Sequence, residues 1–490
     1  MSRRDRCVLL VLTLGPAVAF GQGKLDAAAV AAAAKEAMSP FAAPGLAVAV
    51  VQGDKASVYG FGVRELGHEA PVTPDTIFAL ASMTKAFTAT AVGLLVDDGK
   101  AGWDDPVRRH LDWFRLKDPL ADRDVTLRDL LCHRTGLARH DLLWYRASWP
   151  IEEAVRRMAQ LEPAHPVRSR YDYNNLTFAA AGLAVGKAAG KPWDEFVRER
   201  IFTPLGMKNA VFTAAEAKAR PDHATPHRRA GNRQAVISWY PDEKQVRASG
   251  SIKASGRDLV PWLRMQLDGG VLDGKRIISA ASLAETHRPQ IVVRLSPAAA
   301  RLTETTQASY GLGWSLRDYR GWGLVEHGGA NDGFRGRIVL VPKAKLGLAI
   351  LTNCEEGEMV EALGHRLLDE ALGLKPKEWV ALARKRQSPP RTPPTPKPGT
   401  KPSRELAAYA GKYRDEAYGE LVIEEKGRGL HLAWSSFRVP LAHFHFDTFQ
   451  AKAKDEENQR VDQELATFAL DEAGDVARVT FLGRTFRRGG

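Results

Sequence analysis

The sequence predicts an α+β domain followed by a small all-β domain. Strand-like runs rich in apolar and β-branched residues stand at both ends of the first 375 residues, and helix-favouring segments lie between them. A proline-rich stretch then precedes a last segment of short strand-like runs. A chain of 490 residues is longer than one compact core needs, which also favours two domains.

The first domain is predicted over residues 24–375 as an antiparallel sheet flanked by helices. The Ala-rich segment Ala27–Met38 favours a helix, and a second helix is predicted over Met83–Asp98. Gly53-Asp54 between two strand-like runs indicates a hairpin. Because strands flank a helical middle, we expect one sheet built from both ends of the domain. The runs are Gly45–Val51, Ala56–Phe61, Gly336–Val341 and Leu348–Thr352.

Residues 376–403 are predicted to form an extended linker, because seven prolines fall between Gln387 and Ser403 with few apolar residues among them. From residue 404 to 490, short strand-like runs alternate with Gly, Asp and Asn turns. This pattern predicts a small β domain, of which a barrel is one form. The runs are Glu420–Glu424, Leu430–Trp434, Ala451–Ala453 and Val479–Leu482.

The N-terminus is typical of an export signal over residues 1–21. Basic Arg3, Arg4 and Arg6 precede an apolar run that continues to about Phe20, and Ala17-Val18-Ala19 supplies small residues for cleavage. The run is too short to span a bilayer as a stable helix, although an uncleaved anchor is the alternative. We therefore expect an exported protein, periplasmic or secreted, that is not stably inserted in a membrane after cleavage.

The net charge of +12 does not predict nucleic-acid binding. Residues 375–404 carry +8 and the first six residues carry +2, so the rest of the chain is nearly neutral. Of the three cysteines, Cys7 leaves with the signal, and Cys132 and Cys354 pair only if the fold brings them together. No CxxC motif is present, and the sequence predicts neither a metal nor a cofactor.

Ser82-Met83-Thr84-Lys85 is the one SxxK motif of the chain and stands at the start of the predicted helix. Side chains three residues apart share one face of a helix and can meet. A serine hydroxyl needs an adjacent base to become a nucleophile, and a lysine can serve if burial or a nearby charge lowers its pKa. The motif alone is weak, because the alternative is a serine that caps backbone donors at a helix start.

Two further motifs follow in the order that SxxK hydrolases use. Tyr173-Asn174-Asn175 precedes an apolar helix-like stretch, and His327-Gly328-Gly329 comes just before the predicted C-terminal hairpin, where glycines let backbone approach a ligand. Tyr173 could instead be a packed aromatic, and His327 a strand-end residue that only shapes a rim. No GxSxG, Walker A or dinucleotide pattern occurs.

With these three motifs the chain resembles the serine β-lactamase and penicillin-binding-protein superfamily, in particular its class C-like branch of esterases and D-amino-acid peptidases. The similarity covers roughly Ala43 to Leu372, and the tail is similar to a small β domain often appended to such hydrolases. The framework segments that add to the likeness are Leu130–Leu137, Tyr310–Trp314 and Gly336–Asn353.

The resemblance implies a role for each motif residue. Ser82 would be the nucleophile, with Lys85 accepting its proton or polarising Tyr173. Tyr173 would relay that proton to the leaving group and later help to activate the deacylating water. Asn175 would hydrogen-bond Lys85 and a substrate amide. The backbone N–H groups of Ser82 and Ala330, beside Gly328 and Gly329, would form the oxyanion hole.

The chain departs from many of these relatives at His327, where they place a lysine. A neutral imidazole attracts a substrate carboxylate less than an ammonium does, which disfavours β-lactamase or carboxypeptidase activity. Arg335 or Arg337 could restore the charge if either faces the site. His133 is expected to be structural, bonding a loop backbone.

These observations predict an exported serine hydrolase that forms an acyl-enzyme on Ser82 and cleaves small esters, amides or D-amino-acid-containing peptides. The alternatives are a β-lactamase or penicillin-binding protein, and a slow or inactive protein that binds cell-wall peptides. The expected partner is the small-molecule or peptide substrate, not a nucleic acid. The sequence does not determine the oligomeric state.

Overall fold

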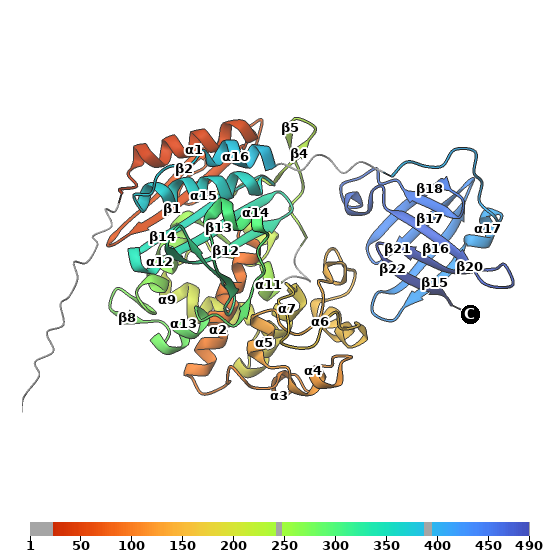
Figure 1. The fold of residues 1–490 in the computed structure, drawn as a ribbon, viewed down its shortest axis with the longest axis horizontal. Coiled ribbons are helices and arrows are strands. Elements are labelled where there is room, and N and C mark those ends of the chain that lie inside the picture. The colour runs from red at the N-terminus through yellow and green to blue at the C-terminus, as the bar shows by residue number, and fades with distance from the viewer. Residues whose placement is uncertain (1–22, 242–246, 387–393, 490) are drawn as a thin grey trace, which may run out of the picture.

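The chain folds into a large α+β part and a small β-barrel in a computed structural model that describes residues 23–241, 247–386 and 394–489. Figure 1 shows the barrel set beside the helical side of the larger part. The predicted signal peptide, residues 1–21, lies outside the described residues. Within the described ranges, no helix is both long and apolar enough to cross a membrane.

The larger part is built on an eight-stranded sheet with the order β2-β1-β14-β13-β12-β11-β10-β9. The first strands pair directly with the last, with Leu46 opposite Thr352, which confirms a sheet built from both ends. The hairpin predicted at Gly53-Asp54 joins β1 and β2. The strands are β1 (Gly45–Gln52), β2 (Lys55–Gly62), β9 (Ile291–Val292), β10 (Ala308–Tyr310), β11 (Ser315–Tyr319), β12 (Trp322–Asn331), β13 (Phe334–Val341) and β14 (Leu346–Thr352).

One face of the sheet is covered by α1 (Ala27–Phe41), α15 (Gly357–Ala371) and α16 (Trp379–Arg386) (Figure 1). Helix α1 begins at Asp26, whose side chain accepts a hydrogen bond from the backbone of Ala29. Helix α16 falls inside the range 376–403 that was predicted as a linker and packs against α15. The linker prediction therefore overlaps a packed helix.

The other face packs against α2 (Thr84–Asp97), α12 (Gly256–Leu267) and the helical middle. Alternate residues of β14 serve the two cores: Leu348 and Ile350 face the α15 side, whereas Ala349 faces the α12 side. The remaining helices are α3 (Val107–His110), α4 (Pro119–Asp124), α5 (Leu127–Leu131), α6 (Ile151–Arg156), α7 (Asn175–Ala189), α8 (Trp193–Val197), α9 (Thr203–Leu205), α10 (Ala214–Lys218), α11 (Arg247–Gly250), α13 (Ala280–Thr286) and α14 (Pro297–Thr303).

Three two-stranded pairs accompany the helical middle. They are β3 (Ile77–Ala79) with β6 (Lys253–Ser255), β4 (His227–Ala230) with β5 (Arg233–Val236), and β7 (Val271–Leu272) with β8 (Lys275–Arg276).

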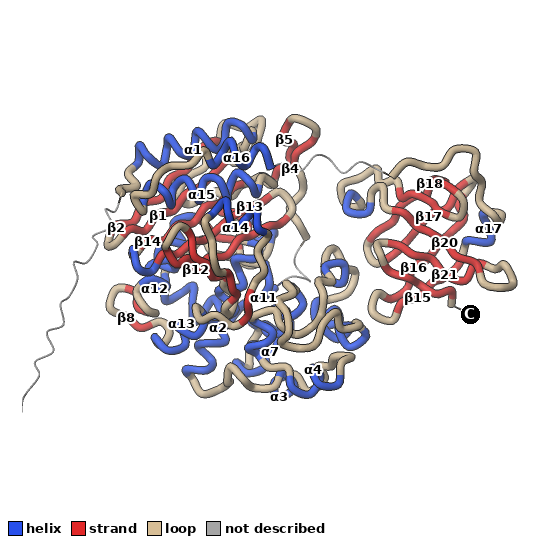
Figure 2. Tube along the Cα trace, in the orientation of Figure 1, coloured by secondary structure: helices blue, strands red, loops and turns tan. Residues whose placement is uncertain are grey.

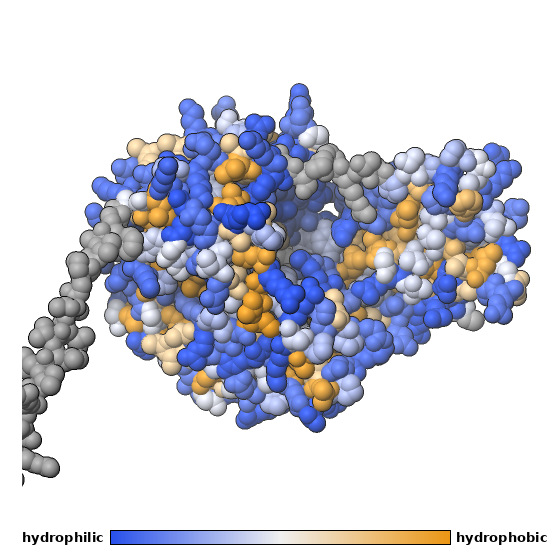
Figure 3. Space-filling view, in the orientation of Figure 1, coloured by the Kyte–Doolittle hydropathy of each residue, from blue (hydrophilic) through white to orange (hydrophobic). Residues whose placement is uncertain are grey.

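Cys132 and Cys354 are both buried and free, so the fold does not pair them. The face drawn in Figure 3 is mostly hydrophilic, and its hydrophobic residues gather in separate patches.

The C-terminal part is a closed barrel of eight antiparallel strands, preceded by α17 (Leu406–Tyr409) (Figure 2). Closure comes from β15 pairing with β22, where Tyr413 lies opposite Arg488. The predicted run Ala451–Ala453 is displaced, since the strand there ends at Ala451. The strands are β15 (Gly411–Asp415), β16 (Gly419–Lys426), β17 (Gly429–Trp434), β18 (Phe437–His445), β19 (Thr448–Ala451), β20 (Leu465–Leu470), β21 (Val476–Phe481) and β22 (Arg484–Arg488).

Candidate active site

Ser82 lies on a short 3-10 turn, Ala81–Met83, that runs directly into α2. Ala81 has φ of 48°, a left-handed conformation that costs energy for a residue with a Cβ. Strand β12 crosses this turn at van der Waals distance: a Cβ on Gly329 would lie 2.2 Å from the carbonyl oxygen of Leu80. A glycine is thus required there for the strand to reach the serine turn.

Lys85 stands one turn into the helix, as the SxxK spacing predicts, and its side-chain nitrogen lies 3.1 Å from Ser82 Oγ. The same nitrogen lies 2.7 Å from Asn175 Oδ1 and 2.7 Å from the backbone oxygen of Ser249. Lys85 is fully buried. Burial lowers its pKa well below the usual value, the carboxylate of Asp141 opposes this shift, and the cation of Arg139 adds to it.

The oxygen of Ser249 reaches Lys85 because α11 packs tightly against α7. A Cβ on Gly182 of α7 would lie 2.3 Å from Ala248 Cβ, so only glycine permits this approach. The hydroxyl of Thr88, one turn beyond Lys85, donates to the carbonyl oxygen of Ala248 over 2.6 Å and holds α11 from the other side. Neither Ser249 nor Gly182 was identified from the sequence.

Asn175 is the first residue of α7, whose N-cap Asn174 accepts from the backbone N–H of Leu176. The two ends of the Asn175 amide have different partners: Oδ1 accepts from Lys85, and Nδ2 donates to Asp141 Oδ1 over 2.9 Å. Asp141 was missed from the sequence. It begins a short 3-10 turn, Asp141–Leu143, with no sequence motif around it, so no local pattern marks it.

Tyr173 is half-buried beside Ser82 and Lys85. The side-chain nitrogen of Lys85 lies 4.8 Å from its ring centroid, and the guanidinium carbon of Arg139 lies 5.2 Å from the same centroid. Burial raises the pKa of the Tyr173 phenol, and a hydrogen bond with the Ser82 hydroxyl acts in the opposite direction. The phenol is therefore protonated at neutral pH.

His327 lies within β12, the strand that comes just before the predicted hairpin of β13 and β14. Its Nδ1 is 2.7 Å from the carbonyl oxygen of Gly328, and its Nε2 is 2.9 Å from the hydroxyl of Tyr310. A carbonyl only accepts, so Nδ1 carries the proton and Nε2 accepts from Tyr310. Burial and the nearby Lys85 lower the pKa of His327 to about 3, and the imidazole is neutral.

The end of β12 offers a free backbone edge toward Ser82. Strand β11 pairs with β12 only as far as Glu326, so residues 327–331 have no paired strand on that side in the described part of the chain. Asn331 and Phe334 flank a two-residue turn and form a hydrogen-bonded pair, so the next pair, Ala330 with Arg335, is a non-hydrogen-bonded one. The N–H of Ala330 accordingly points away from β13.

Arg335 and Arg337, the two arginines that could supply the positive charge missing at position 327, have different environments. Arg337 is buried and forms ion pairs with Glu326 and Glu361. Arg335 lines the cavity, although its terminal N–H groups donate to the backbone oxygens of Asn331 and Phe334. Of these two, only Arg335 could therefore present charge to a substrate.

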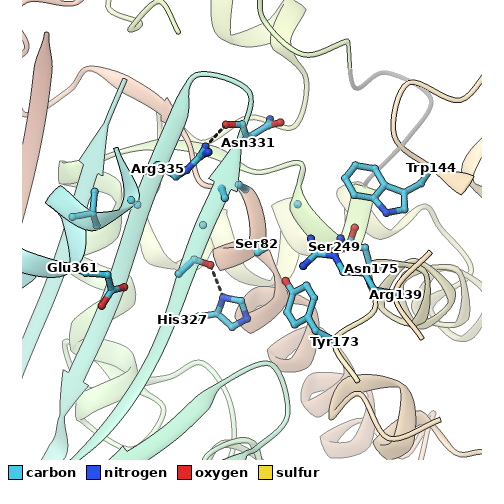
Figure 4. A pocket seen from close by; sticks show the side chains of 18 of the residues that line it. Ser82, Arg139, Trp144, Tyr173, Asn175, Ser249, His327, Asn331, Arg335 and Glu361 are labelled. Carbon is cyan, nitrogen blue, oxygen red and sulfur yellow. Dashed lines mark hydrogen bonds between the residues drawn. The ribbon is translucent and has the colours of Figure 1, made fainter. Parts of the chain in front are cut away.

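These residues surround a cavity of about 500 Å³ (Figure 4). In this view Tyr173 and His327 lie on either side below Ser82, Arg139 lies beside Tyr173, and Trp144 lies above them on the same side as Tyr173. Seven predicted site residues line the cavity, and Lys85 lies beneath Ser82. The seven are Ser82, Tyr173, Asn175, His327, Gly328, Gly329 and Ala330.

His133 is buried behind Tyr173 with φ of 59°, and its Nδ1 accepts from the backbone N–H of Asn174 over 3.1 Å. This is the loop-bonding position that the sequence predicts for it. Among the residues described, no group of three or more His, Cys, Asp or Glu side chains is placed to hold a metal ion.

A family model described as Beta-lactamase matches residues 30–373, and the chain belongs to this family of β-lactamase-fold, penicillin-binding-protein-like hydrolases. A second model, a domain of unknown function (DUF3471), matches residues 395–487, which form the barrel. The predicted superfamily and the two-part fold are thereby confirmed.

Curated relatives cover most of the chain. An unguisins hydrolase of Aspergillus campestris is 29% identical over 426 residues, which span 79% of this chain and 76% of the relative. Penicillin-binding protein 4 of Amycolatopsis lactamdurans is 32% identical over 316 residues, which span 63% of this chain and 81% of the relative.

Solved structures share the fold at lower identity. The octameric penicillin-binding protein homologue from Pyrococcus abyssi is 21% identical with a TM-score of 0.65, over 94% of this chain and 99% of that one. The D-amino acid amidase from Ochrobactrum anthropi is 23% identical with a TM-score of 0.56, over 73% of this chain and 98% of that one. The first likeness includes the barrel, since it spans nearly the whole chain.

Proposed function

We propose that the protein is an exported serine hydrolase that works through an acyl-enzyme on Ser82. One observation carries the proposal: a fully buried lysine whose nitrogen lies 3.1 Å from a cavity-lining serine hydroxyl, with its pKa lowered by burial. A neutral amine at this distance can take the proton of Ser82 as the hydroxyl attacks.

The two neighbours divide the proton transfers according to their charge states. Lys85, whose pKa is lowered by burial, accepts the Ser82 proton in its neutral form while Oγ forms a bond to the substrate carbonyl carbon. Tyr173, protonated because its pKa is raised, gives its proton to the leaving alcohol or amine as the bond between that group and the carbonyl carbon breaks. Lys85 then returns a proton to Tyr173. Water then attacks the ester through the same pair in reverse, releasing the acid and free Ser82.

The substrate oxygen that gains negative charge would be held by two backbone donors. The N–H of Ala330 points into the open edge of β12, and the N–H of Ser82 lies at the start of α2. Each donor in such a site is worth about 3 kcal/mol of transition-state stabilisation. Gly329 supports this arrangement, since its lack of a Cβ lets the strand meet the serine turn.

The substrate class follows from the charge at the far side of the cavity. His327 on β12 is neutral and Arg337 on β13 is engaged in ion pairs. These two strands therefore present no free cation where a carboxylate would lie, apart from the partly engaged Arg335. Uncharged carbonyl substrates are favoured: small esters, amides and D-amino-acid-containing peptides. The name of one structural relative, a D-amino acid amidase, agrees with amide substrates.

The test is intact mass after exposure to a fluorophosphonate. Wild type should gain one adduct, and Ser82→Ala should gain none. Ser251→Ala is the matched control, because its buried hydroxyl has no hydrogen-bond partner in the described residues and does not line the cavity. It should label like wild type. An adduct that persists in folded Ser82→Ala, or a folded wild type that never labels, would overturn the proposal and favour a peptide-binding protein.

A further inference from the structure

We infer that the C-terminal barrel supports the active site from outside the cavity. Tyr418 is a positioning residue that holds the 138–149 segment in place through His140, and so keeps Asp141 hydrogen-bonded to Asn175. The inference rests on the proposed acylation of Ser82 and assigns to the barrel a role in that chemistry.

The 138–149 segment connects α5 to α6 and has little regular structure of its own, with a single 3-10 turn at Asp141–Leu143. It nevertheless supplies Arg139 and Trp144 to the wall of the catalytic cavity (Figure 4). A loop that belongs to no long helix or sheet relies on outside contacts to keep such side chains in one place.

On its inner side the segment orients Asn175. Asp141 Oδ1 accepts from Asn175 Nδ2 over 2.9 Å and from the indole N–H of Trp144 over 2.8 Å, and Oδ2 accepts from Arg139. An amide whose Nδ2 is bound to a carboxylate must turn its Oδ1 the other way, which here is toward Lys85. Asp141 thereby determines which end of the Asn175 amide Lys85 meets.

On its outer side the adjacent residue, His140, is bound by the barrel. Its Nδ1 lies 2.8 Å from the hydroxyl of Tyr418 and 2.9 Å from the guanidinium of Arg484. A guanidinium only donates, so Nδ1 is an acceptor and the imidazole is neutral. Burial, together with the charge of Arg484 and against that of Asp141, lowers the pKa of His140 to about 4.

Two further contacts fasten the end of the segment to the same barrel. The hydroxyl of Ser436 donates to the carbonyl oxygen of Arg146, and the backbone N–H of Ser148 donates to Ser435 Oγ over 3.1 Å. These contacts join residues 278 to 290 positions apart in the sequence. The barrel therefore holds the segment on one side, and α7 and the turn after β12 hold it on the other.

Tyr418 can be changed with little disturbance to the barrel. Its ring packs beside Trp434 and under the guanidinium of Arg484, and Tyr418→Phe keeps both contacts while removing the hydroxyl. Tyr413→Phe is the matched control, because Tyr413 is equally buried and its hydroxyl bonds to the carbonyl oxygen of Tyr409 inside the barrel.

The first measurement, made on the full chain, is amide hydrogen exchange, which does not depend on activity. Tyr418→Phe should speed exchange in peptides that cover the 138–149 segment, where Leu143, Trp144 and Tyr145 donate backbone hydrogen bonds. Tyr413→Phe should leave these peptides as in wild type. Unchanged exchange in Tyr418→Phe overturns the inference, whatever Ser82 does.

The second measurement is the rate and pH profile of Ser82 acylation by a fluorophosphonate. Tyr418→Phe should slow it about threefold to tenfold, the usual effect of one lost hydrogen bond. Its acidic limb should move to lower pH, because Asp141 raises the pKa of Lys85 and would lie farther away. His140→Asn, which keeps an acceptor, should label close to the wild-type rate, whereas His140→Leu should resemble Tyr418→Phe.

The outcomes separate the two claims. A wild type that never labels defeats the proposed function, and the exchange data still decide whether the barrel holds the segment. A wild type that labels, with Tyr418→Phe and Tyr413→Phe showing the same rate and the same pH profile, overturns the inference alone. Equal rates for His140→Asn and His140→Leu would also overturn it.

Discussion

The α-carbon of Gly329 faces the carbonyl oxygen of Leu80 so closely that an added Cβ would lie only 2.2 Å from it. This contact seats β12 on the turn that presents Ser82, and it explains why the second glycine of the HGG motif must be a glycine. The first glycine is different, since a Cβ on Gly328 would meet only the backbone oxygen of Gly336, at 3.8 Å.

Gly329→Ala should therefore push β12 off the serine turn and move the N–H of Ala330 away from the developing oxyanion. We expect kcat/KM for an ester substrate to fall about 100-fold or more, the usual effect of losing one such donor. Gly328→Ala, on the same strand, should stay within a few-fold of wild type. Equal losses in both variants would contradict this account of the motif.

Arg139→Gln should shift the acidic limb of the acylation rate to higher pH. The guanidinium of Arg139 lowers the pKa of Lys85, so removing that cation lets the pKa of Lys85 rise, and a higher pH is then needed to form the neutral amine. Fluorophosphonate labelling rates from pH 5 to 9 measure the limb. Arg109→Gln, at a largely exposed arginine paired with Asp105, is the control and should leave it in place.

His327 should make the fold less stable in acid. Its pKa is about 3 in the folded chain against an ordinary value of 6.5, so the unfolded chain binds more protons between these pH values. The free energy of unfolding then falls as pH drops below 6.5, by about 2 kcal/mol at pH 5 from this residue. His327→Asn should reduce the loss between pH 7 and pH 5 in urea unfolding, whereas replacing exposed His68 should not.

His327→Lys should change substrate preference. A lysine at this position would place a cation on β12 beside the cavity, where a substrate carboxylate could pair with it. We expect the ratio of kcat/KM for nitrocefin, which carries a carboxylate, to that for a neutral ester to rise about tenfold or more. A ratio that does not change would mean that the charge at residue 327 does not select the substrate.

Much of the fold follows from local patterns. The hairpin at Gly53-Asp54, the helix after Ser82 and the late strands Gly336–Val341 and Leu348–Thr352 all appear where the sequence predicts them, within a few residues. Each depends on propensities and turn residues that act within one element. The strands β15, β18, β20 and β22 were not identified, because they become strands only by closing the barrel with neighbours.

For the candidate site as well, local sequence patterns predict some features and only the tertiary structure decides others. The sequence by itself determined the spacing that brings Ser82 and Lys85 together on one helical turn, because a helix dictates the geometry of residues three apart. Only the tertiary structure decided that Lys85 is buried, that His327 is neutral against Tyr310, and that Asp141 orients Asn175. Burial and charge state depend on what packs around a side chain, and those neighbours come from distant segments that no local pattern connects.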